Sequence, residues 1–463
     1  RQFLKYVSEL CPISTLLGCL TVAQNTSIIV EPFDGDNAII SIDQVKDLLM
    51  QDNKYFKVTA FKLLVTSPKP SSPIKPYIYD IIQCCTDSFF CEMDIETRNK
   101  IISLLKFFIS RIRDSTHKLD RDCKKMINSQ QDKFRVEIEQ KRIAINLAEK
   151  FLNRLLNDTL FNLRPGSSHQ RKAFAFMVLL LLIRSGLDSR LEPLHHDKFK
   201  IVEYPFHIQI YSSDLLRTMI DNITDDYGDN RIDSVRILSM SPISINQKLL
   251  SLATERAFVY LQNMKGKTVD SGARYFAFLF KYYQSHEEYD KCILILQTLE
   301  GMLVNGIDDA KNNLAEACFK SNIHGFFLTF GLLFEIIDFE RFGKYEYVNR
   351  LIDSLLQNAI ASWKVTREVL QHDSPEGNLP EEIENNYSSK LEAQYGKGTQ
   401  VISSYAWRTL KESSVLLDSL INNAPLKSDL ILLIGPLLRE QLATIRHRGA
   451  FSAVYPTYVS CCL

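Results

Sequence analysis

The sequence predicts an all-α protein whose helices stack as successive hairpins. Apolar residues recur every three or four positions along most of the chain, candidate strands are scarce, and short breaks rich in Pro, Gly and Ser separate the amphipathic stretches. A weak repeat places a small residue three positions after a basic one and an apolar residue three positions further on. It occurs at Lys57, Ala60 and Leu63, at Lys172, Ala175 and Val178, at Arg274, Ala277 and Phe280, and in part at Arg236 and Ser239. Such a repeat is typical of an α-solenoid of HEAT- or armadillo-like units.

The amino-acid composition excludes few classes of function. Of the 463 residues 45% are hydrophobic, which suffices for a large core. Lys plus Arg and Asp plus Glu number 55 each, so any nucleic-acid surface must be local. The ten cysteines include no CxxC spacing, and the pairs Cys84-Cys85 and Cys461-Cys462 lie in apolar helical sequence. This usage favours buried free thiols in a reducing compartment over a disulfide or zinc framework.

Residues 1–160 are predicted to be helical repeats with two irregular segments. Around residues 26–42, two β-branched runs flank an Asp-Gly-Asp sequence, which fits a short hairpin or, equally, a loop between helices. Residues 111–142 are rich in Lys and Arg. The candidate contacts there with an RNA backbone are Lys124, Lys125, Lys141 and Arg142. The alternative, which we favour, is a solvated helix with ion pairs between residues four positions apart.

Residues 161–371 are predicted to form further HEAT-like repeats, followed by an acidic loop at 372–400. The aliphatic run Ala173 to Ile183 is too short to span a membrane and predicts a buried helix. Pro and Gly interrupt the helical pattern in the acidic loop, where Ser374, Glu376 and Gly377 are the candidate functional residues. The loop is either a disordered linker or an ordered functional element.

Residues 401–463 are predicted to form three amphipathic helices. In the first, Trp407 falls on the apolar face and is predicted to be a core residue, while Arg408, Lys411 and Glu412 fall opposite. Arg408 and Glu412 are spaced as an intrahelical ion pair, with contact to RNA or to a partner as the alternative. The other two helices cover residues 430–438 and 450–463 and are joined by a basic turn. In that turn Arg446 and Arg448 either cap the preceding helix or meet a phosphate.

The patterns of common catalytic sites are missing from the sequence. It contains no phosphate-binding loop after a strand, no HExxH and no GxSxG, and no glycine-rich turn that would hold S-adenosylmethionine. The pair His195-His196 is better explained as surface or capping residues than as metal ligands. We therefore predict a protein that is not an enzyme and that has no metal, no cofactor of its own and no membrane span.

Three separated motifs are similar to a known family. They read DSPEGNLPEE (373 to 382), WRTLKESSVLLDSL (407 to 420) and RHRGAFSAVYPTYV (446 to 459), with weaker likenesses in RPGSSHQRKAFAFMVLLLL (164 to 182) and NIHGFFLTFGLLFE (322 to 335). Their order resembles the central domain of the THADA-type proteins, the regulatory partners of tRNA ribose methyltransferases. The amino-acid sequence of these motifs is most similar to that of a budding-yeast-type member. The resemblance implies that the chain is a middle fragment of a longer protein.

The resemblance implies a cytoplasmic α-solenoid that binds a FtsJ-like methyltransferase and the tRNA anticodon loop and arm. The complex would methylate the ribose 2′-OH at tRNA position 32, with S-adenosylmethionine and the catalytic residues in the partner. The motif residues that correspond to the family's pattern are Trp407, Arg408, Lys411 and Glu412, then Arg446, Arg448 and Gly449, and in the loop Ser374, Glu376 and Gly377. Two alternatives stay open: a general protein-binding scaffold for transport or assembly without RNA contact, and an enzyme in its own right.

Overall fold

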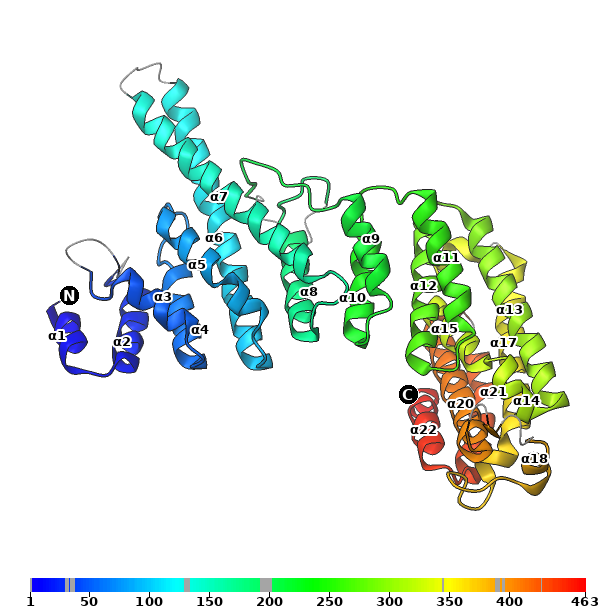
Figure 1. Cartoon of the computed structure of the whole chain (residues 1–463). Helices are drawn as coiled ribbons and strands as arrows, with labels where there is room; N and C mark the ends of the chain where they lie inside the picture. Colours follow the sequence, from blue (N-terminus) through cyan, green and yellow to red (C-terminus); the bar gives the residue numbers. More distant parts are fainter. Residues whose placement is uncertain are drawn as a thin grey trace. The chain divides into compact units, whose positions relative to one another are not determined.

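A computed structural model describes most of the chain. The described residues are 2–29, 33, 38–128, 134–191, 202–343, 345–387, 392–393, 396–425 and 427–463. Within them the chain forms 21 helices and no strand, which confirms the predicted all-α class (Figure 1). The helices form two compact units. Unit 1 comprises Arg1–Thr218 and Met240–Ser244, and unit 2 comprises Met219–Ser239 and Ile245–Leu463.

Unit 1 is a stack of helical hairpins. Its helices are α1 (Gln2–Leu10), α2 (Ile13–Asn25), α3 (Ile42–Met50), α4 (Lys54–Val65), α5 (Pro76–Phe90), α6 (Ile95–Asn128), α7 (Arg135–Asn162), α8 (His169–Arg184) and the first part of α9 (Ser213–Asn222). Helix α4 packs against α2, α3, α5 and α6, and α8 packs against α5, α6 and α7. Contacts between helices that are near neighbours in sequence are the mark of the predicted solenoid.

Local signals set the start of three of these helices. Helix α3 begins with a capping box, in which the Gln44 amide donates to Ser41 Oγ at 3.1 Å and the Ser41 amide donates to Gln44 Oε1 at 3.0 Å. Asn53 caps α4 by accepting a hydrogen bond from the Tyr55 amide at 3.0 Å. Pro76 is the first residue of α5, where its missing N–H costs no helical hydrogen bond.

The segment around residues 26–42 joins α2 to α3. Residues 30–32 and 34–37, the centre of the proposed hairpin, lie outside the described residues. The described flanks contain no strand, and Ile29, Phe33 and Ile40 are nonetheless buried. In this part of the segment the apolar side chains therefore serve the helical core rather than a sheet.

Helices α6 and α7 form a long hairpin that extends beyond the neighbouring helices of unit 1 (Figure 1). Near its base, Phe108 and Phe151 meet edge to face with 5.6 Å between ring centroids. The basic segment 111–142 comprises the end of α6 and the start of α7, and residues 129–133 between them are not described. Its first residue corrects the prediction of a solvated segment, because Arg111 is buried and its Nη1 donates to Val65 O at 3.1 Å.

Two basic residues of the weak repeat, Lys57 and Arg274, form ion pairs. Lys57 pairs with Glu92 at 2.7 Å, and both side chains are nearly buried. Arg274 pairs with Asp270, one turn earlier in its helix, at 2.8 Å. Ala60 is fully buried, so the small residue of the repeat does lie where helices approach closely.

Two smaller expectations have mixed outcomes. The run 173–183 is the buried part of α8, as predicted, and no described helix is long and apolar enough to cross a bilayer.

All ten cysteines are free. The expectation of buried thiols is right for Cys85 but wrong for Cys84 and Cys462, which face outward on the exposed sides of their helices.

Unit 2 continues the same architecture in two layers. Its helices after α9 are α10 (Gly228–Ser239), α11 (Gln247–Leu261), α12 (Gly266–Ser285), α13 (Tyr289–Asn312), α14 (Leu314–Lys320), α15 (Ile323–Phe334), α16 (Phe339–Phe342), α17 (Glu346–Gln371), α18 (Glu381–Asn385), α20 (Gly398–Asn423), α21 (Lys427–Thr444) and α22 (Arg448–Cys462). Helices α12, α15, α20 and α22 contact one another in succession, and α13, α17 and α21 do the same beside them.

Helix α15 lies at the centre of unit 2. It packs against α12, α13 and α20, and ten of its twelve residues are buried. The helix is apolar on all sides, which is expected of a helix inside a core. Two of its polar groups form hydrogen bonds nearby: Thr329 Oγ1 donates to Gly325 O at 2.7 Å, and Gly331 O accepts from Ser419 Oγ of α20 at 3.1 Å.

Two glycines allow helices α11, α12 and α15 to meet closely at Leu261. A Cβ at Gly272 of α12 would lie 2.5 Å from the Leu261 amide nitrogen and 3.0 Å from Ala257 O. A Cβ at Gly325 of α15 would lie 3.1 Å from Leu261 O. Because these neighbours are backbone atoms, they cannot turn away as a flexible side chain would.

We expect Gly272→Ala to lower stability by about 1 to 3 kcal/mol, because the added methyl group forces α11 and α12 apart. The measurement is the unfolding midpoint in denaturant and by calorimetry. Gly301→Ala on the exposed face of α13, where an added Cβ meets nothing within 4 Å, is the matched control. It should be neutral or stabilising by up to about 1 kcal/mol, since Ala favours helix over Gly. Equal midpoints for the two variants would contradict this account of the packing.

Candidate interaction site at the junction of helices α17, α20 and α22

The turn between α21 and α22 is fastened to the end of α17. The backbone amides of Arg446 and His447 both donate to Leu370 O, at 2.9 and 3.3 Å. Beside them Gln371 Nε2 donates to Thr444 Oγ1 at 2.7 Å. The Leu370 carbonyl, one of the last of α17, is thus satisfied by the turn between α21 and α22. We call the turn of residues 446–449 and the chain around it the junction.

The start of the acidic loop folds back onto the junction. Ser374 adopts a positive φ of 52°, and its carbonyl accepts from the Gly377 amide at 2.9 Å, which makes a tight turn. Glu376 Oε1 then accepts from the Arg448 amide at 3.2 Å, and Asp373 forms an ion pair with Arg446. Hydrogen bonds from backbone amides, its own and that of Arg448, lower the pKa of Glu376. Residues 373–378 are therefore ordered, as the functional-loop interpretation requires, and α18 further on adds a short helix inside the predicted loop.

Trp407 joins α20 to the same junction. Its indole stacks on the imidazole of His447, with 6.3 Å between ring centroids and 14° between ring planes. His447 caps α22, because its Nδ1 accepts from the Ala450 amide at 3.1 Å. The prediction that Trp407 is a core residue is wrong: the side chain is half-buried, because α20 meets the turn before α22 at this point instead of a full helix.

Gly449 makes this stacking contact possible. A Cβ there would lie 3.1 Å from Trp407 Nε1 and 3.2 Å from His447 Cε1. Both neighbours belong to the stacked rings of Trp407 and His447, and the indole Nε1 is buried, so an added methyl group would displace one of the rings. The three sequence motifs that resemble one family thus meet in space, although more than sixty residues separate the loop from the turn.

Arg408, Lys411 and Glu412 do not interact as predicted. Arg408 Nη1 donates to Met264 O, in the turn before α12, at 2.8 Å. Glu412 is only 7% exposed and forms its ion pair with Lys411, at 2.8 Å, instead of with Arg408. The predicted Arg408–Glu412 pair is wrong because the carbonyl of a neighbouring helical hairpin competes for the guanidinium. Glu412 is likewise not on a solvated face.

The two arginines of the junction differ in their surroundings. The Arg446 guanidinium is engaged by Asp373, and both side chains are largely exposed. The Arg448 side chain is exposed and has no ion-pair or hydrogen-bond partner among the residues that the structure describes. Neither guanidinium caps the end of α21 within the described part of the chain, so the capping alternative is wrong for this turn. Arg448 is the more available cation.

The candidate residues on α6 and α7 belong to unit 1, whereas the junction belongs to unit 2. Lys124 pairs with Asp120 at 2.7 Å and Lys141 with Glu137 at 3.0 Å, each with the partner four positions earlier. Lys125 and Arg142 are exposed. The favoured interpretation, a helix with ion pairs along its surface, therefore describes this part of the segment better than a bare basic patch.

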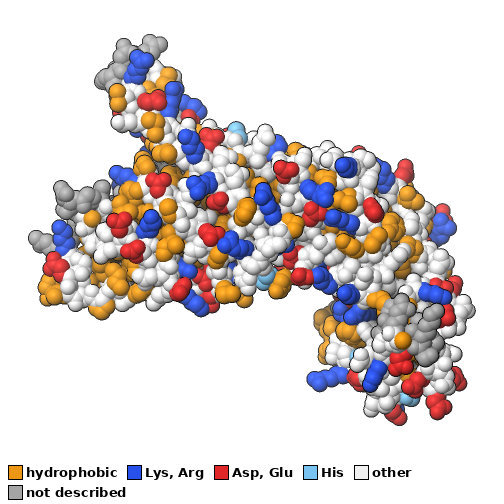
Figure 2. Space-filling model, in the orientation of Figure 1, with side chains coloured by type: hydrophobic (Ala, Val, Ile, Leu, Met, Phe, Trp, Pro, Cys, Tyr) orange, Lys and Arg blue, Asp and Glu red, His pale blue; other side chains and the backbone are white. Residues whose placement is uncertain are grey.

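Figure 2 shows how charge is distributed on one face of the chain. On the face that Figure 2 draws, Lys and Arg side chains alternate with Asp and Glu, with no continuous basic surface among the described residues. The described residues also contain no group of three or more His, Cys, Asp or Glu placed to hold a metal ion. His195 and His196 lie outside the described residues.

Sequence reasoning missed one polar residue of unit 2. His324, near the start of α15, is 5% exposed, and neither ring nitrogen has a hydrogen-bond partner among the described residues. Burial, with a smaller contribution from Arg408 and Lys411, lowers its pKa to about 3. The sequence did contain a signal for this residue: His324 is the one ionisable side chain in the mostly apolar stretch NIHGFFLTFGLLF.

The fold and the junction together define a helical-repeat protein with a surface site built from a loop and helix ends. Comparison with known families is more specific. A model described as Trm732, TPR repeats, matches residues 1–232, and one described as THADA/TRM732, DUF2428, matches residues 350–463. The chain belongs to the THADA/TRM732 family.

Named relatives agree with this assignment. The tRNA (32-2′-O)-methyltransferase regulator trm732 of Schizosaccharomyces pombe is 26% identical over 434 residues, which cover 90% of this chain and 28% of that protein. The tRNA (32-2′-O)-methyltransferase regulator THADA of Drosophila melanogaster is 26% identical over 189 residues, covering 35% of this chain and 11% of that protein. The chain thus spans about a quarter of the length of the first relative and less of the second.

Solved structures of Kap121p align with almost the whole chain but only loosely. The complex with Pho4p matches at 11% identity with a TM-score of 0.28, over 99% of this chain and 52% of that one. The complex with Nup53p matches at 10% identity with a TM-score of 0.29, over 96% and 52%. Superpositions this loose carry no conclusion about function.

We expect Gly449→Ala to lower the unfolding midpoint and to separate Trp407 from His447, at a cost of about 1 kcal/mol. Thermal unfolding measures the first effect, and a red shift and altered intensity of the Trp407 fluorescence, recorded in a Trp363→Phe background, measure the second. Gly377→Ala is the control, because an added Cβ there meets nothing within 4 Å. If both alanine variants behave alike, the close fit at Gly449 is not what holds the junction.

Proposed function

We propose that this chain is part of a non-catalytic regulatory subunit of a tRNA ribose 2′-O-methyltransferase. The observation that carries the proposal is the match of two THADA/TRM732 family models to the two ends of the chain, residues 1–232 and 350–463. The two relatives are named as regulators of a tRNA (32-2′-O)-methyltransferase. A regulator of this kind would contribute binding and orientation, while catalysis belongs to its partner.

In this proposal the partner is a FtsJ-like methyltransferase that binds S-adenosylmethionine and supplies the catalytic residues. The subunit holds the tRNA anticodon loop and arm in the cytoplasm so that the ribose at position 32 faces the methyl donor. Fixing a nucleophile against its reaction partner removes much of the entropic cost of the encounter and so raises the rate. Stacked helices suit that task, because their extended surfaces follow the shape and backbone of a folded RNA.

Within unit 2, the junction is the proposed contact with the tRNA backbone. Arg448 offers a guanidinium that no described residue engages, and Arg446 lies two residues away with an exposed acidic partner. Arginine recognises phosphate through paired N–H donors in a fixed plane. The loop of residues 373–378 and the stacking of Trp407 on His447 hold these arginines in place. Lys125 and Arg142 of unit 1 are secondary candidates for the same chemistry.

We expect the double change Arg446→Ala with Arg448→Ala to weaken tRNA binding by the chain in complex with its methyltransferase. For every phosphate that is no longer bound, the slope of log K against log salt concentration should also fall by about 1. Binding is measured by fluorescence anisotropy at several salt concentrations. Methylation at position 32 should fall in parallel.

The matched control removes two cations elsewhere in unit 2. Arg350→Ala with Lys248→Ala changes exposed residues of α17 and α11, and Arg350 lies about 30 Å along α17 from the junction. This control should leave the salt slope unchanged. An unaltered slope in the Arg446 and Arg448 variant would remove the junction from the RNA-binding surface.

A second candidate function is a general protein-binding scaffold without RNA contact, which the balanced surface charge favours (Figure 2). The two functions differ in what is recovered when the protein is purified from its native cells. We expect the methyltransferase and tRNA to be recovered together, and ribonuclease treatment to release the tRNA. Recovery of transport or assembly factors with no tRNA, before any ribonuclease treatment, would favour the scaffold instead.

A further inference from the structure

A pocket of about 220 Å³ lies in unit 2 between α12, α15 and α20. Its walls come from the turn before α12, from Cys318 of α14, from the start of α15 and from the first turns of α20. Met264, Asn322, His324, Tyr405 and Arg408 are the lining residues that matter here. Two of the family-like motifs, those beginning at residues 322 and 407, reach this pocket, which we call the His324 pocket.

We propose that the His324 pocket binds one unstacked nucleotide of RNA, with the base edge against His324 and the phosphate at Arg408. The inference rests on the proposed function, because it assumes that the chain contacts tRNA, and it adds a site that the junction does not contain. Sequence-specific proteins recognise RNA mostly through bases splayed out of loops, and a pocket of this size has room for one base.

The first argument is the unsatisfied imidazole. Buried polar groups in native proteins nearly always have a hydrogen-bond partner, since burial without one is costly. His324 is 5% exposed, lines the pocket, and finds no partner for Nδ1 or Nε2 among the described residues. Its low pKa keeps the ring neutral near pH 7. A neutral imidazole offers one N–H donor and one acceptor nitrogen.

This pairing of donor and acceptor favours a base over a simple anion. A carboxylate or a phosphate only accepts hydrogen bonds, so it would leave the acceptor nitrogen of His324 unsatisfied. The edge of a nucleobase presents donors and acceptors together, and hydrogen bonding to such edges is how single-stranded bases are recognised. The ring of Tyr405 also lines the pocket and offers an apolar surface for the base.

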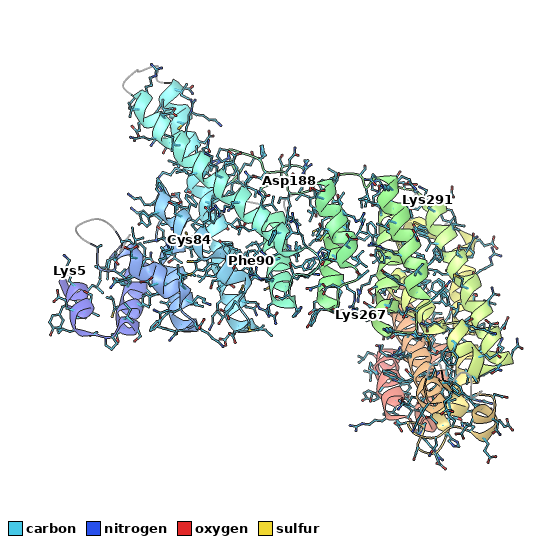
Figure 3. The ribbon with its side chains drawn as sticks, in the orientation of Figure 1. Lys5, Cys84, Phe90, Asp188, Lys267 and Lys291 are labelled. Atoms are coloured by element: carbon cyan, nitrogen blue, oxygen red, sulfur yellow. The ribbon has the colours of Figure 1, made fainter. Side chains whose placement is uncertain are left out.

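The second argument is the positive potential at the rim. Among the residues that the structure describes, no Asp or Glu lines the pocket, and Arg408 is the one charged residue that does. Arg408 gives one hydrogen bond to Met264 O, which fixes the guanidinium above Gly266 at the start of α12. Lys267, the next residue of that turn, is labelled in Figure 3 and is engaged by Asp226. Arg408 is therefore the cation nearest to a bound phosphate.

Two helix N-termini add to this potential. The N-cap residues Lys265 of α12 and Asn322 of α15 make no side-chain capping hydrogen bond. These helices have 20 and 12 residues, so both carry a full dipole with its positive end at the pocket. At α15 the amides of Ile323 and Gly325 already donate to Ser321 O and Asn322 O, so the amides suited to a phosphate are those in the first turn of α12. The rim thus fits the anionic part of a nucleotide, and the buried end fits its base.

The experiment uses tRNA with 4-thiouridine at single positions of the anticodon loop and the full chain in complex with its methyltransferase. After irradiation, mass spectrometry locates the crosslinks. We expect at least one loop position to crosslink to a peptide that contains residues 318–324 or 400–408. His324→Leu, which keeps the volume but removes both hydrogen-bonding atoms, should abolish that crosslink and weaken tRNA binding about tenfold, as expected for the loss of two hydrogen bonds.

Two further variants keep the test valid if His324→Leu folds poorly. His324→Gln retains a donor and an acceptor and should keep binding within about threefold of the unchanged protein. Arg408→Gln acts at the half-exposed rim, and it should weaken tRNA binding and reduce its salt dependence. Helical content and unfolding midpoints are recorded for each variant. Normal tRNA affinity in folded His324→Leu and Arg408→Gln would overturn the pocket proposal.

The remaining outcomes separate this proposal from the proposed function. If tRNA binds and depends on Arg446 and Arg448, yet no crosslink reaches the pocket, the proposed function stands and the nucleotide site is wrong. If the complex shows no tRNA affinity at all, both are wrong. If His324→Leu instead weakens binding of the methyltransferase in the absence of tRNA, the pocket holds a protein side chain, which also overturns the nucleotide site.

Discussion

The burial of α15 is the constraint on which unit 2 depends. This helix is apolar on all sides, so it must be enclosed by α12, α13 and α20. Gly272 and Gly325 let α12 and α15 approach the backbone at Leu261 without a Cβ in the way. Helix α20 then has its position set by contact with α15 along much of its length. The contact between α15 and α20 therefore sets the position of every functional residue that we propose on α20.

One turn of α20 connects the two proposed sites. Trp407 and Arg408 are adjacent in sequence, and successive residues of an α-helix point about 100° apart. Trp407 therefore reaches the junction through His447, while Arg408 reaches the turn before α12 through Met264 O. A ligand that shifted Arg408 would press on the helix that carries Trp407. Because the core is close-packed, such a shift would move α20 as a rigid body rather than bend it locally.

Periodicity was sufficient to predict the helices, the lack of strands among the described residues and the buried run in α8, since these depend on spacing along the chain. The ordered start of the acidic loop was one of two stated interpretations. Side-chain partners were not predictable in the same way. Arg408 turned to Met264 O rather than to Glu412, and the isolation of His324 depends on where α12 and α20 lie around α15. Both outcomes are set by residues far away in sequence, which a local pattern does not contain.

The acidic residues around the junction would make the proposed tRNA contact selective among RNAs. Asp373 and Glu376 lie beside Arg446 and Arg448, so a polyanion approaching without the right shape meets like charge as well as cations. Asp373 and Arg446 are both largely exposed, and exposed ion pairs are weak, so a well-placed phosphate displaces Asp373 at little cost. Glu376 differs, because backbone amides hold its carboxylate in the folded loop. The junction therefore combines one exchangeable acid with one fixed acid, and in the proposed complex an RNA would have to place its phosphate at Arg446 and avoid Glu376 in order to gain from both arginines.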